Sequence, residues 1–166
     1  MVQLNGIDVA ELRDYVETVA QDPTKADRDP VVVARWVGSE RAEVISTSGG
    51  ASVFMGGDGE PSAMRMLLMA LAACDVDLIA NRAALLGVEI QSLTVEARGH
   101  FNVQRYLGLE APSGPGYDRV EYTVHLKTNG ATSGQLAELH RACEEASPVG
   151  DTLKRSVALN VEFEAS

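Results

Sequence analysis

The chain has 166 residues, 45% of them hydrophobic, which is enough for one globular domain with a sizeable core. Acidic side chains outnumber basic ones by 24 to 14, and the formal net charge of −10 argues against DNA, RNA or an anionic membrane as a partner. Two cysteines are too few for a disulfide scaffold, and neither a signal pattern nor an apolar run of bilayer length is visible, so we expect a soluble, cytoplasmic protein.

The N-terminal third is predicted to hold one helix followed by three short strands. The helix covers Asn5 to Gln21, with Asp8 suited to the N-cap and Glu11 following at capping-box spacing. A polar segment with two prolines, residues 22–30, ends this helix. β-branched residues separated by glycine turns then predict three strands, at 31–37, 41–47 and 51–55.

The longest predicted helix runs from Ser62 to Leu86 and begins after a glycine-rich turn. One of its faces repeats apolar residues at i, i+4, i+7 and i+11, namely Leu67, Leu71, Cys74 and Leu78. The segment 64–74 is apolar nearly all round, which is typical of a helix buried in a core. The thiol of Cys74 is therefore either a small core filler or a reactive group.

The C-terminal half is predicted to hold three strands and two helices. A long strand covers 88–103 with one irregularity near Gln91 and Ser92, and residues 119–127 alternate as a half-exposed strand. Two helices, at 133–145 and 151–155, precede a last strand at 157–163. The strands are grouped rather than alternating with helices, which predicts an α+β fold in a single domain, with residues 1–29 as an additional N-terminal helix and linker.

Three further side chains near the C-terminus have simple structural readings. Ser147 precedes Pro148 and suits the N-cap of the short helix. Cys143 is either an apolar filler of its helix or a second thiol that works with Cys74. His140 and Cys143 have the spacing of half a metal site, but no second pair of ligands accompanies them, so we expect no metal. No phosphate-binding glycine motif is present, and we expect no cofactor.

Two segments resemble a known superfamily, that of osmotically inducible protein C (OsmC) and organic hydroperoxide resistance protein (Ohr). The first is Pro-Ser-x-x-x-x-Leu-Leu-x-Ala-Leu-Ala-Ala-Cys, residues 61–74, and the second is Ala-Ser-Pro-Val-Gly-Asp-Thr-Leu, residues 146–153, which is similar to the family signature Cys-Pro-Val-Ser-x-x-Leu. The resemblance covers about 31–163. It implies an OsmC-like fold, with a long buried helix packed on antiparallel sheets, and an intertwined homodimer with active sites across the subunit interface.

The resemblance also assigns roles to single residues. Many members reduce organic hydroperoxides with a helix-borne peroxidatic cysteine and a resolving cysteine, and Cys74 matches the former. Arg41, with Arg35 as second choice, matches the arginine that holds the thiolate. The resolving cysteine of the signature is Ser147 here, and Cys143 is a possible relocated replacement.

The glutamate that in this family accompanies the arginine at the start of the long helix is missing. The nearest acids, Asp58 and Glu60, belong to the preceding turn, so we expect the arginine to lack its usual partner. Arg65 either favours the thiolate as a nearby cation or pairs with Glu60.

The expected function is thiol-dependent reduction of organic hydroperoxides in a homodimer. Cys74 would be oxidised to a sulfenic acid and resolved by Cys143 or by an external thiol, with Arg35, Arg65 and Ser147 as binding residues. The alternative is a non-catalytic protein that binds a small hydrophobic ligand at the dimer interface. A third hypothesis is one-cysteine chemistry on a different electrophile.

Overall fold

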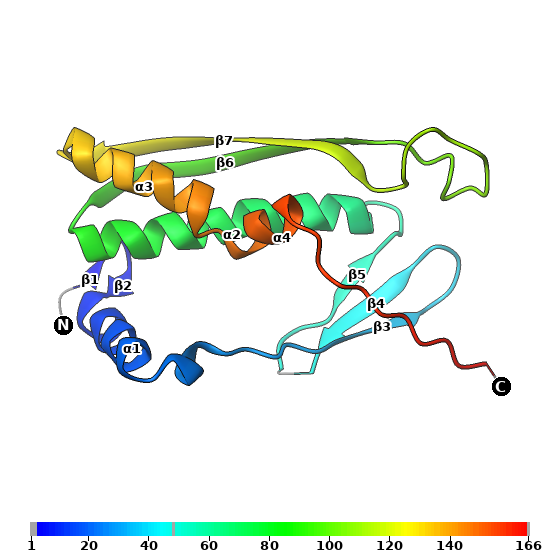
Figure 1. Ribbon diagram of the computed structural model, residues 1–166, viewed down its shortest axis with the longest axis horizontal. Helices are drawn as coiled ribbons and strands as arrows, with labels where there is room; N and C mark the ends of the chain where they lie inside the picture. Colours follow the sequence, from blue (N-terminus) through cyan, green and yellow to red (C-terminus); the bar gives the residue numbers. More distant parts are fainter. Residues whose placement is uncertain (1–2, 48, 166) are drawn as a thin grey trace.

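A long helix beneath an antiparallel ribbon of two strands dominates the computed structural model, which describes residues 3–47 and 49–165 (Figure 1). The helix is α2 (Ala63–Leu86), and the strands are β6 (Glu89–Phe101) and β7 (Tyr117–Asn129). α3 (Ser133–Glu145) and α4 (Pro148–Lys154) also pack against α2. The predicted α+β architecture, with antiparallel sheets and one long helix, is confirmed.

The ends of α2 lie within one residue of the prediction because both carry strong capping residues. The Ser62 hydroxyl accepts a hydrogen bond from the backbone N–H of Arg65 at 3.3 Å. Gly87 follows the last turn at φ 72°, a left-handed conformation that glycine adopts without a steric penalty. The bounds of α3 agree with the prediction at both ends, and α4 begins three residues earlier than predicted, at Pro148.

The buried face of α2 differs from the predicted one. Its buried residues are Leu71, Asp75, Ile79, Ala83 and Ala84. Cys74 and Leu78 are only partly buried, because β6, β7 and α3 cover the i, i+4 row that begins at Leu71. On other sides of the helix, side chains are exposed, and Met69 is 50% exposed. The sequence predicted a helix buried on all sides, whereas within one chain α2 is buried on one side only.

The β6–β7 ribbon pairs Glu89 with Asn129 at one end and Phe101 with Tyr117 at the other. The predicted irregularity is confirmed as a register shift between Ile90 and Ser92. The ribbon and α3 enclose the core cluster, which consists of Ile79, Ala83, Val88, Leu139 and Cys143.

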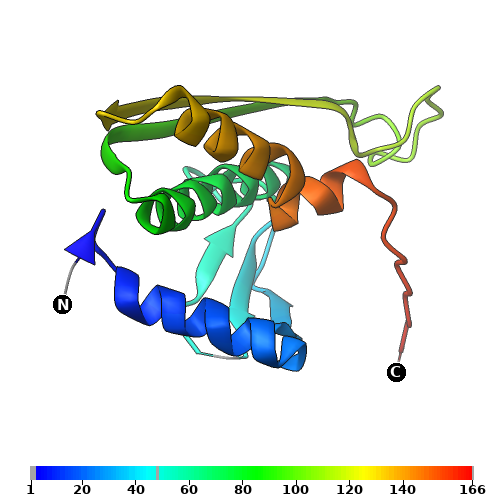
Figure 2. The same cartoon turned by 60° about the vertical axis from the view of Figure 1, so that its left-hand side comes forward.

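A three-stranded antiparallel sheet extends from the start of α2 (Figure 1). Its strands are β3 (Val32–Trp36), β4 (Ala42–Ser46) and β5 (Val53–Met55), which confirms the three predicted strands. The last predicted strand, at 157–163, is wrong for this chain: the segment is extended but pairs with no strand among the described residues (Figures 1 and 2). Its apolar side chains have no covering layer, and Phe163 is 90% exposed.

The N-terminal segment begins with a hairpin rather than with a helix. β1 (Gln3–Leu4) and β2 (Ile7–Asp8) pair across Asn5 and Gly6, which both have positive φ, the conformation of a tight hairpin turn. α1 (Val9–Gln21) follows, and the predicted cap is confirmed because the Asp8 carboxylate accepts from the N–H groups of Ala10 and Glu11. A short 3₁₀ helix, η1 (Pro23–Ala26), then interrupts the predicted linker.

The side chain of Asn5 anchors this hairpin to the junction between α2 and β6. Its Nδ2 donates to the Val88 carbonyl at 3.0 Å, and its Oδ1 accepts from the Ile90 N–H at 2.9 Å. One amide therefore satisfies both a donor and an acceptor of the main chain where β6 begins. Among the described residues, no helix is both long and apolar enough to cross a lipid bilayer.

Replacing Asn5 by glycine is expected to lower the free energy of unfolding by about 2 kcal/mol, because two partly buried backbone groups lose their partner. Glycine keeps the positive φ accessible, so Asn5→Ala is expected to cost about 1 kcal/mol more. Urea denaturation measures both values. Asn102→Gly is the matched control, because its carboxamide accepts a local hydrogen bond, from the Gln104 N–H, and makes no long-range one within residues 3–47 and 49–165. Equal losses in Asn5→Gly and Asn102→Gly would contradict the anchoring role.

Candidate functional site

The thiol of Cys74 lies beside the hydroxyl of Ser147, at the contact between α2 and α4. The distance from Cys74 Sγ to Ser147 Oγ is 3.9 Å, at which either group can donate to the other. Ser147 is buried and is the N-cap of α4, as predicted, since its Oγ accepts from the Gly150 N–H at 3.1 Å. Cys74 is partly buried and keeps some access to solvent. The structure therefore brings together the two positions that the resemblance pairs.

Arg41, just before β4, forms an ion pair with Glu60 in the turn between β5 and α2. Its Nη2 and Nε lie 2.6 and 2.8 Å from Glu60 Oε1, and Glu60 Oε2 accepts from the Gly57 N–H at 3.0 Å. The guanidinium also lies 4.1 Å from the centroid of the Phe54 ring. The first turn of α2 carries no acidic residue, so the usual partner is absent as expected, but Glu60 in the preceding turn takes its place. Glu60 pairs with Arg41 rather than with Arg65.

This pairing changes the titration of both groups. The hydrogen bond from Arg41 lowers the pKa of Glu60 below its ordinary value, and the same bond raises the pKa of Arg41. Because the folded-state pKa of Glu60 is depressed, its contribution to stability is present above the ordinary glutamate pKa. The contribution is lost as the pH falls through the depressed value.

Glycine is required in the turn that carries Glu60. Gly56 has φ 89°, and a Cβ there would lie 2.3 Å from the Glu40 carbonyl oxygen. A Cβ at Gly57 would lie 2.8 Å from Glu60 Oε2. The glycine-rich turn thus lets the main chain approach β4 and the carboxylate closely.

The other two predicted cationic residues lie apart from the Arg41 ion pair. Arg35 is exposed on β3, opposite Glu43 of β4. Arg65 is exposed in the first turn of α2 and acts electrostatically on Tyr117. The Tyr117 hydroxyl donates a hydrogen bond to the Met64 carbonyl at 2.7 Å. Burial raises the pKa of Tyr117, and Arg65 opposes that rise.

Cys143 is buried in the core cluster rather than placed on an accessible surface. Its side chain is 6% exposed, and its Sγ donates to the Leu139 carbonyl at 3.4 Å. Burial raises the pKa of this thiol, and the Asp75 carboxylate raises it further. Both effects favour the neutral thiol over the thiolate.

Asp75 is a buried carboxylate that the sequence analysis did not single out. Its exposed fraction is 0%, and neither carboxylate oxygen has a hydrogen-bond partner within residues 3–47 and 49–165. One signal was available in the sequence: Asp75 lies four residues after Leu71 and four before Ile79, in the middle of an apolar helical row.

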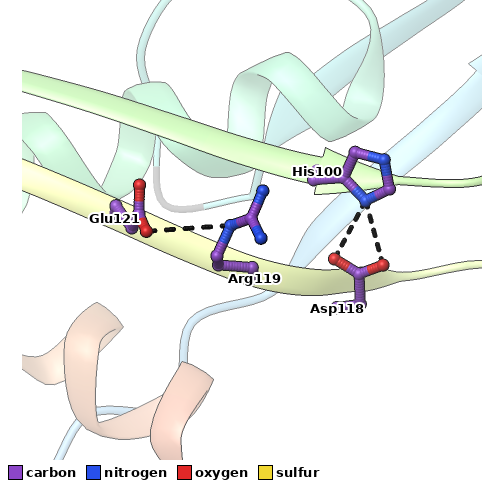
Figure 3. Close-up of polar contacts among 4 residues, drawn as sticks. All are labelled: His100, Asp118, Arg119 and Glu121. Carbon is purple, nitrogen blue, oxygen red and sulfur yellow. Dashed lines mark hydrogen bonds and ion pairs between the residues drawn. The ribbon is translucent and has the colours of Figure 1, made fainter.

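A histidine–carboxylate pair lies on the β6–β7 ribbon (Figure 3). His100 Nδ1 is 2.9 Å from Asp118 Oδ2, and Arg119 and Glu121 form a second pair beside it at 3.7 Å. The side chains of His100 and Asp118 are 61% and 46% exposed, which is typical of a solvated sheet surface.

A cavity of about 240 Å³ lies between α2, β7 and α4, next to the Cys74–Ser147 contact. Leu71 and Gly150 line this cavity on the side of Ser147. The N–H of Gly150 donates to Ser147, and a Cβ on Gly150 would lie 3.9 Å from Leu71. The remaining lining residues combine apolar, aromatic, cationic and acidic groups: Tyr117, Asp118, Arg119, Val120, Tyr122, Leu153 and Lys154.

The fold and site define a class of α+β proteins that carry a partly buried thiol on their long helix. A family model described as OsmC-like protein matches residues 56–162, more than half of the chain, so the chain belongs to the OsmC-like family. The resemblance inferred from the sequence is thereby confirmed. No curated protein matches the chain.

Solved structures with this fold match at low sequence identity. An OsmC-like protein from Mycoplasma pneumoniae has a TM-score of 0.64 and 14% identity, over 77% of this chain and 89% of that one. An organic hydroperoxide resistance protein OsmC from Legionella pneumophila has a TM-score of 0.54 and 15% identity, over 76% and 90%. An OsmC-like protein of unknown function from Vibrio cholerae has a TM-score of 0.58 and 13% identity, over 76% and 94%. These likenesses establish the shared fold.

Restoring a cysteine at position 147 is expected to create a disulfide to Cys74. The side-chain atoms at the two positions lie 3.9 Å apart, and side-chain rotation brings two sulfurs from there to the S–S distance of about 2 Å. Peptide mapping of the Ser147→Cys protein after diamide treatment detects the bond. Ser156→Cys, exposed beyond α4, is the control and should not pair. A free thiol at both positions 74 and 147 after oxidation would contradict the geometry.

Proposed function

We propose that this protein is a thiol-dependent peroxidase that reduces organic hydroperoxides with Cys74 as the peroxidatic residue. The observation that carries the proposal is the placement of the partly buried Cys74 thiol 3.9 Å from Ser147, on the long helix of an OsmC-like fold. The Cys74 thiolate attacks one peroxide oxygen, the O–O bond breaks, and the alkoxide leaves and takes up a proton. The products are an alcohol and a sulfenic acid on Cys74.

The Ser147 hydroxyl supports this step as a hydrogen-bond donor to the sulfur. Its Oγ already accepts from the Gly150 N–H, which leaves its proton free to point toward Cys74. A hydroxyl in this place stabilises a thiolate or a sulfenate but cannot form a disulfide with it. The sulfenic acid is then resolved by Cys143 or by an external thiol, in a reducing cytoplasm.

We propose that the acting unit is a homodimer in which Arg41 of one chain serves Cys74 of the other. Within one chain no hydrogen bond or ion pair joins these two residues in the described part of the structure. The chain also leaves apolar side chains uncovered on α2 and on its C-terminal segment, in particular Leu67, Met69, Val76, Leu159, Val161 and Phe163. Glu60 holds the guanidinium of Arg41 in a fixed orientation, from which it can stabilise a thiolate and a leaving alkoxide.

A second candidate function is binding of a small hydrophobic ligand without catalysis. It is favoured by Ser147 at the position of the resolving cysteine and by the cavity of about 240 Å³ beside Leu71. A binding protein would keep its ligand affinity after Cys74→Ala, whereas a peroxidase would lose its activity.

Cys74→Ser is expected to abolish consumption of cumene hydroperoxide, because a serine hydroxyl does not attack the O–O bond at neutral pH. In the unmodified protein, dimedone added with the peroxide should label Cys74, as detected by mass spectrometry. Cys143→Ser is the matched control and should still give the label at Cys74. A Cys74 thiol that stays reduced while the peroxide persists would refute the catalytic proposal.

Arg41→Met is expected to lower kcat/KM for the hydroperoxide on the order of a hundredfold, because it removes the charge that stabilises the developing anions. Steady-state peroxide consumption at several substrate concentrations measures this change. Arg35→Met, on the neighbouring strand, is the comparison variant. A larger loss in Arg35→Met than in Arg41→Met would reverse the roles assigned to the two residues.

A further inference from the structure

The cavity of about 240 Å³ between α2, β7 and α4 has a buried inner end and a charged outer end. Leu71 and Gly150, which line it, are buried, whereas the lining residues Arg119 and Lys154 are exposed. A water molecule takes up about 30 Å³ in the liquid, so this volume has room for a molecule of roughly ten non-hydrogen atoms. Such a molecule would have its apolar part inside and its polar part at the exposed end.

The aromatic wall of this cavity is fixed in place by a bulge in β7. The register of the ribbon shifts before Phe101 of β6, so Asp118 is an extra residue of β7. The Tyr117 ring, next to the bulge, reaches α2, where its hydroxyl donates to the Met64 carbonyl at 2.7 Å. It packs edge-on against Phe101, with 5.3 Å between the ring centroids. A Cβ on Gly99 would lie 2.4 Å from this ring, so a glycine there makes room for it.

Three polar side chains of the lining already have hydrogen-bond partners. The hydroxyls of Tyr117 and Tyr122 each donate to a backbone carbonyl, at 2.7 and 3.3 Å. Both carboxylate oxygens of Asp118 lie within 3.0 Å of His100 Nδ1, as Figure 3 shows. The protons of both phenols are therefore used, and the side-chain donors left for a ligand are cationic.

Those cationic donors belong to Arg119 of β7 and Lys154 of α4. Arg119 Nε lies 3.7 Å from Glu121 Oε1, which is too far for a hydrogen bond, and its guanidinium has no hydrogen bond to any other described residue. Lys154 Nζ donates one of its three protons to the Glu144 carbonyl at 2.5 Å. Two cations on different elements thus have donors free beside one cavity, which suits an anion that accepts from both.

We propose that this cavity binds a small carboxylic acid with an apolar body of the size of one ring, and that Arg119 and Lys154 hold its carboxylate. The apolar body packs against Leu71 and Val120 at the inner end. Cys74 is not among the lining residues, so the site goes beyond the proposed peroxidase function and does not depend on it. It also specifies the ligand of the second candidate function as an anion.

The first test follows binding of phenylacetate to the unmodified, 15N-labelled chain through its backbone amide shifts. The expected result is a saturable shift that is largest at lining residues such as Leu71, Val120, Gly150 and Leu153. Phenylacetamide lacks the charge and acetate lacks the ring, so each is expected to bind about tenfold more weakly. No saturable shift at these amides, or equal affinity for phenylacetate and phenylacetamide, would overturn the proposal.

The second test removes the two cations. Arg119→Gln combined with Lys154→Gln is expected to weaken phenylacetate binding about tenfold, because two charge-assisted hydrogen bonds are lost. The matched control is Arg98→Gln combined with Lys127→Gln, which removes the same charge from exposed positions of the ribbon outside the lining. Equal weakening in the two double variants would show a general effect of net charge and would refute the site.

The third test fills the cavity and leaves every charge in place. Val120→Phe is expected to abolish phenylacetate binding, and the amide spectrum of the variant reports whether it is folded. Binding that persists in folded Val120→Phe would place the ligand elsewhere. The first test uses the unmodified chain and no peroxide, so it decides the proposal whether or not this variant folds and whether or not Cys74 reacts.

Discussion

The structure depends on one constraint, which is that the first half of α2 is apolar on nearly every side but is covered on only part of its surface. The ribbon of β6 and β7 and the helix α3 bury the row of α2 residues that begins at Leu71. Val88, just before β6, is part of the same core cluster. Burial of apolar area contributes about 25 cal/mol per Å², so the apolar residues of this row stabilise the packing of the ribbon and α3 on α2. The uncovered sides, which include Met69 and Val76, are the surface that the proposed homodimer would cover.

The same helix separates two thiol environments. Cys74 and Asp75 are consecutive, and a helix turns by about 100° per residue, so they face different neighbours. The sulfur of Cys74 meets the capping hydroxyl of Ser147, in a place with some solvent access. Asp75 is fully buried, in the helical row that continues to Ile79 and Ala83 of the core cluster that holds Cys143. Burial raises the pKa of the Cys143 thiol, which is hydrogen-bonded to the Leu139 carbonyl.

The sequence predicted the elements whose ends carry local signals. Ser62 and Gly87 delimit α2, and the strands β3 to β5 follow from β-branched residues between glycine turns. The predictions failed where the local structure depends on a contact with residues distant in sequence. The turn at Asn5 is fixed by Val88 and Ile90, more than eighty residues away. The segment 157–163 has the alternation of a strand, but no strand of its own chain pairs with it in the described structure.

For the site, the resemblance matched Cys74 and Ser147 to the positions of the family's two cysteines, and the structure places their side chains 3.9 Å apart. The partner of Arg41 was missed because Glu60 stands outside the position that the motif specifies, and only the fold of the glycine turn brings it within 2.6 Å. Asp75 was missed because charge was weighed over the whole chain rather than along each helical row. A carboxylate between Leu71 and Ile79 at i, i+4 spacing is detectable in the sequence once the row, and not the composition, is examined.

Serine at position 147, which the resemblance matches to a resolving cysteine, has a structural effect as well as a chemical one. A serine hydroxyl is a good N-cap, and here it accepts from the Gly150 N–H while Pro148 occupies the first helical position. Sulfur is a weaker acceptor, so serine strengthens the start of α4 where a cysteine would weaken it. The hydroxyl also leaves the sulfur of Cys74 without a covalent partner at 3.9 Å. With serine rather than cysteine at position 147, α4 has a stronger N-cap. If the protein is a peroxidase, its resolving thiol must then come from another position or from solution.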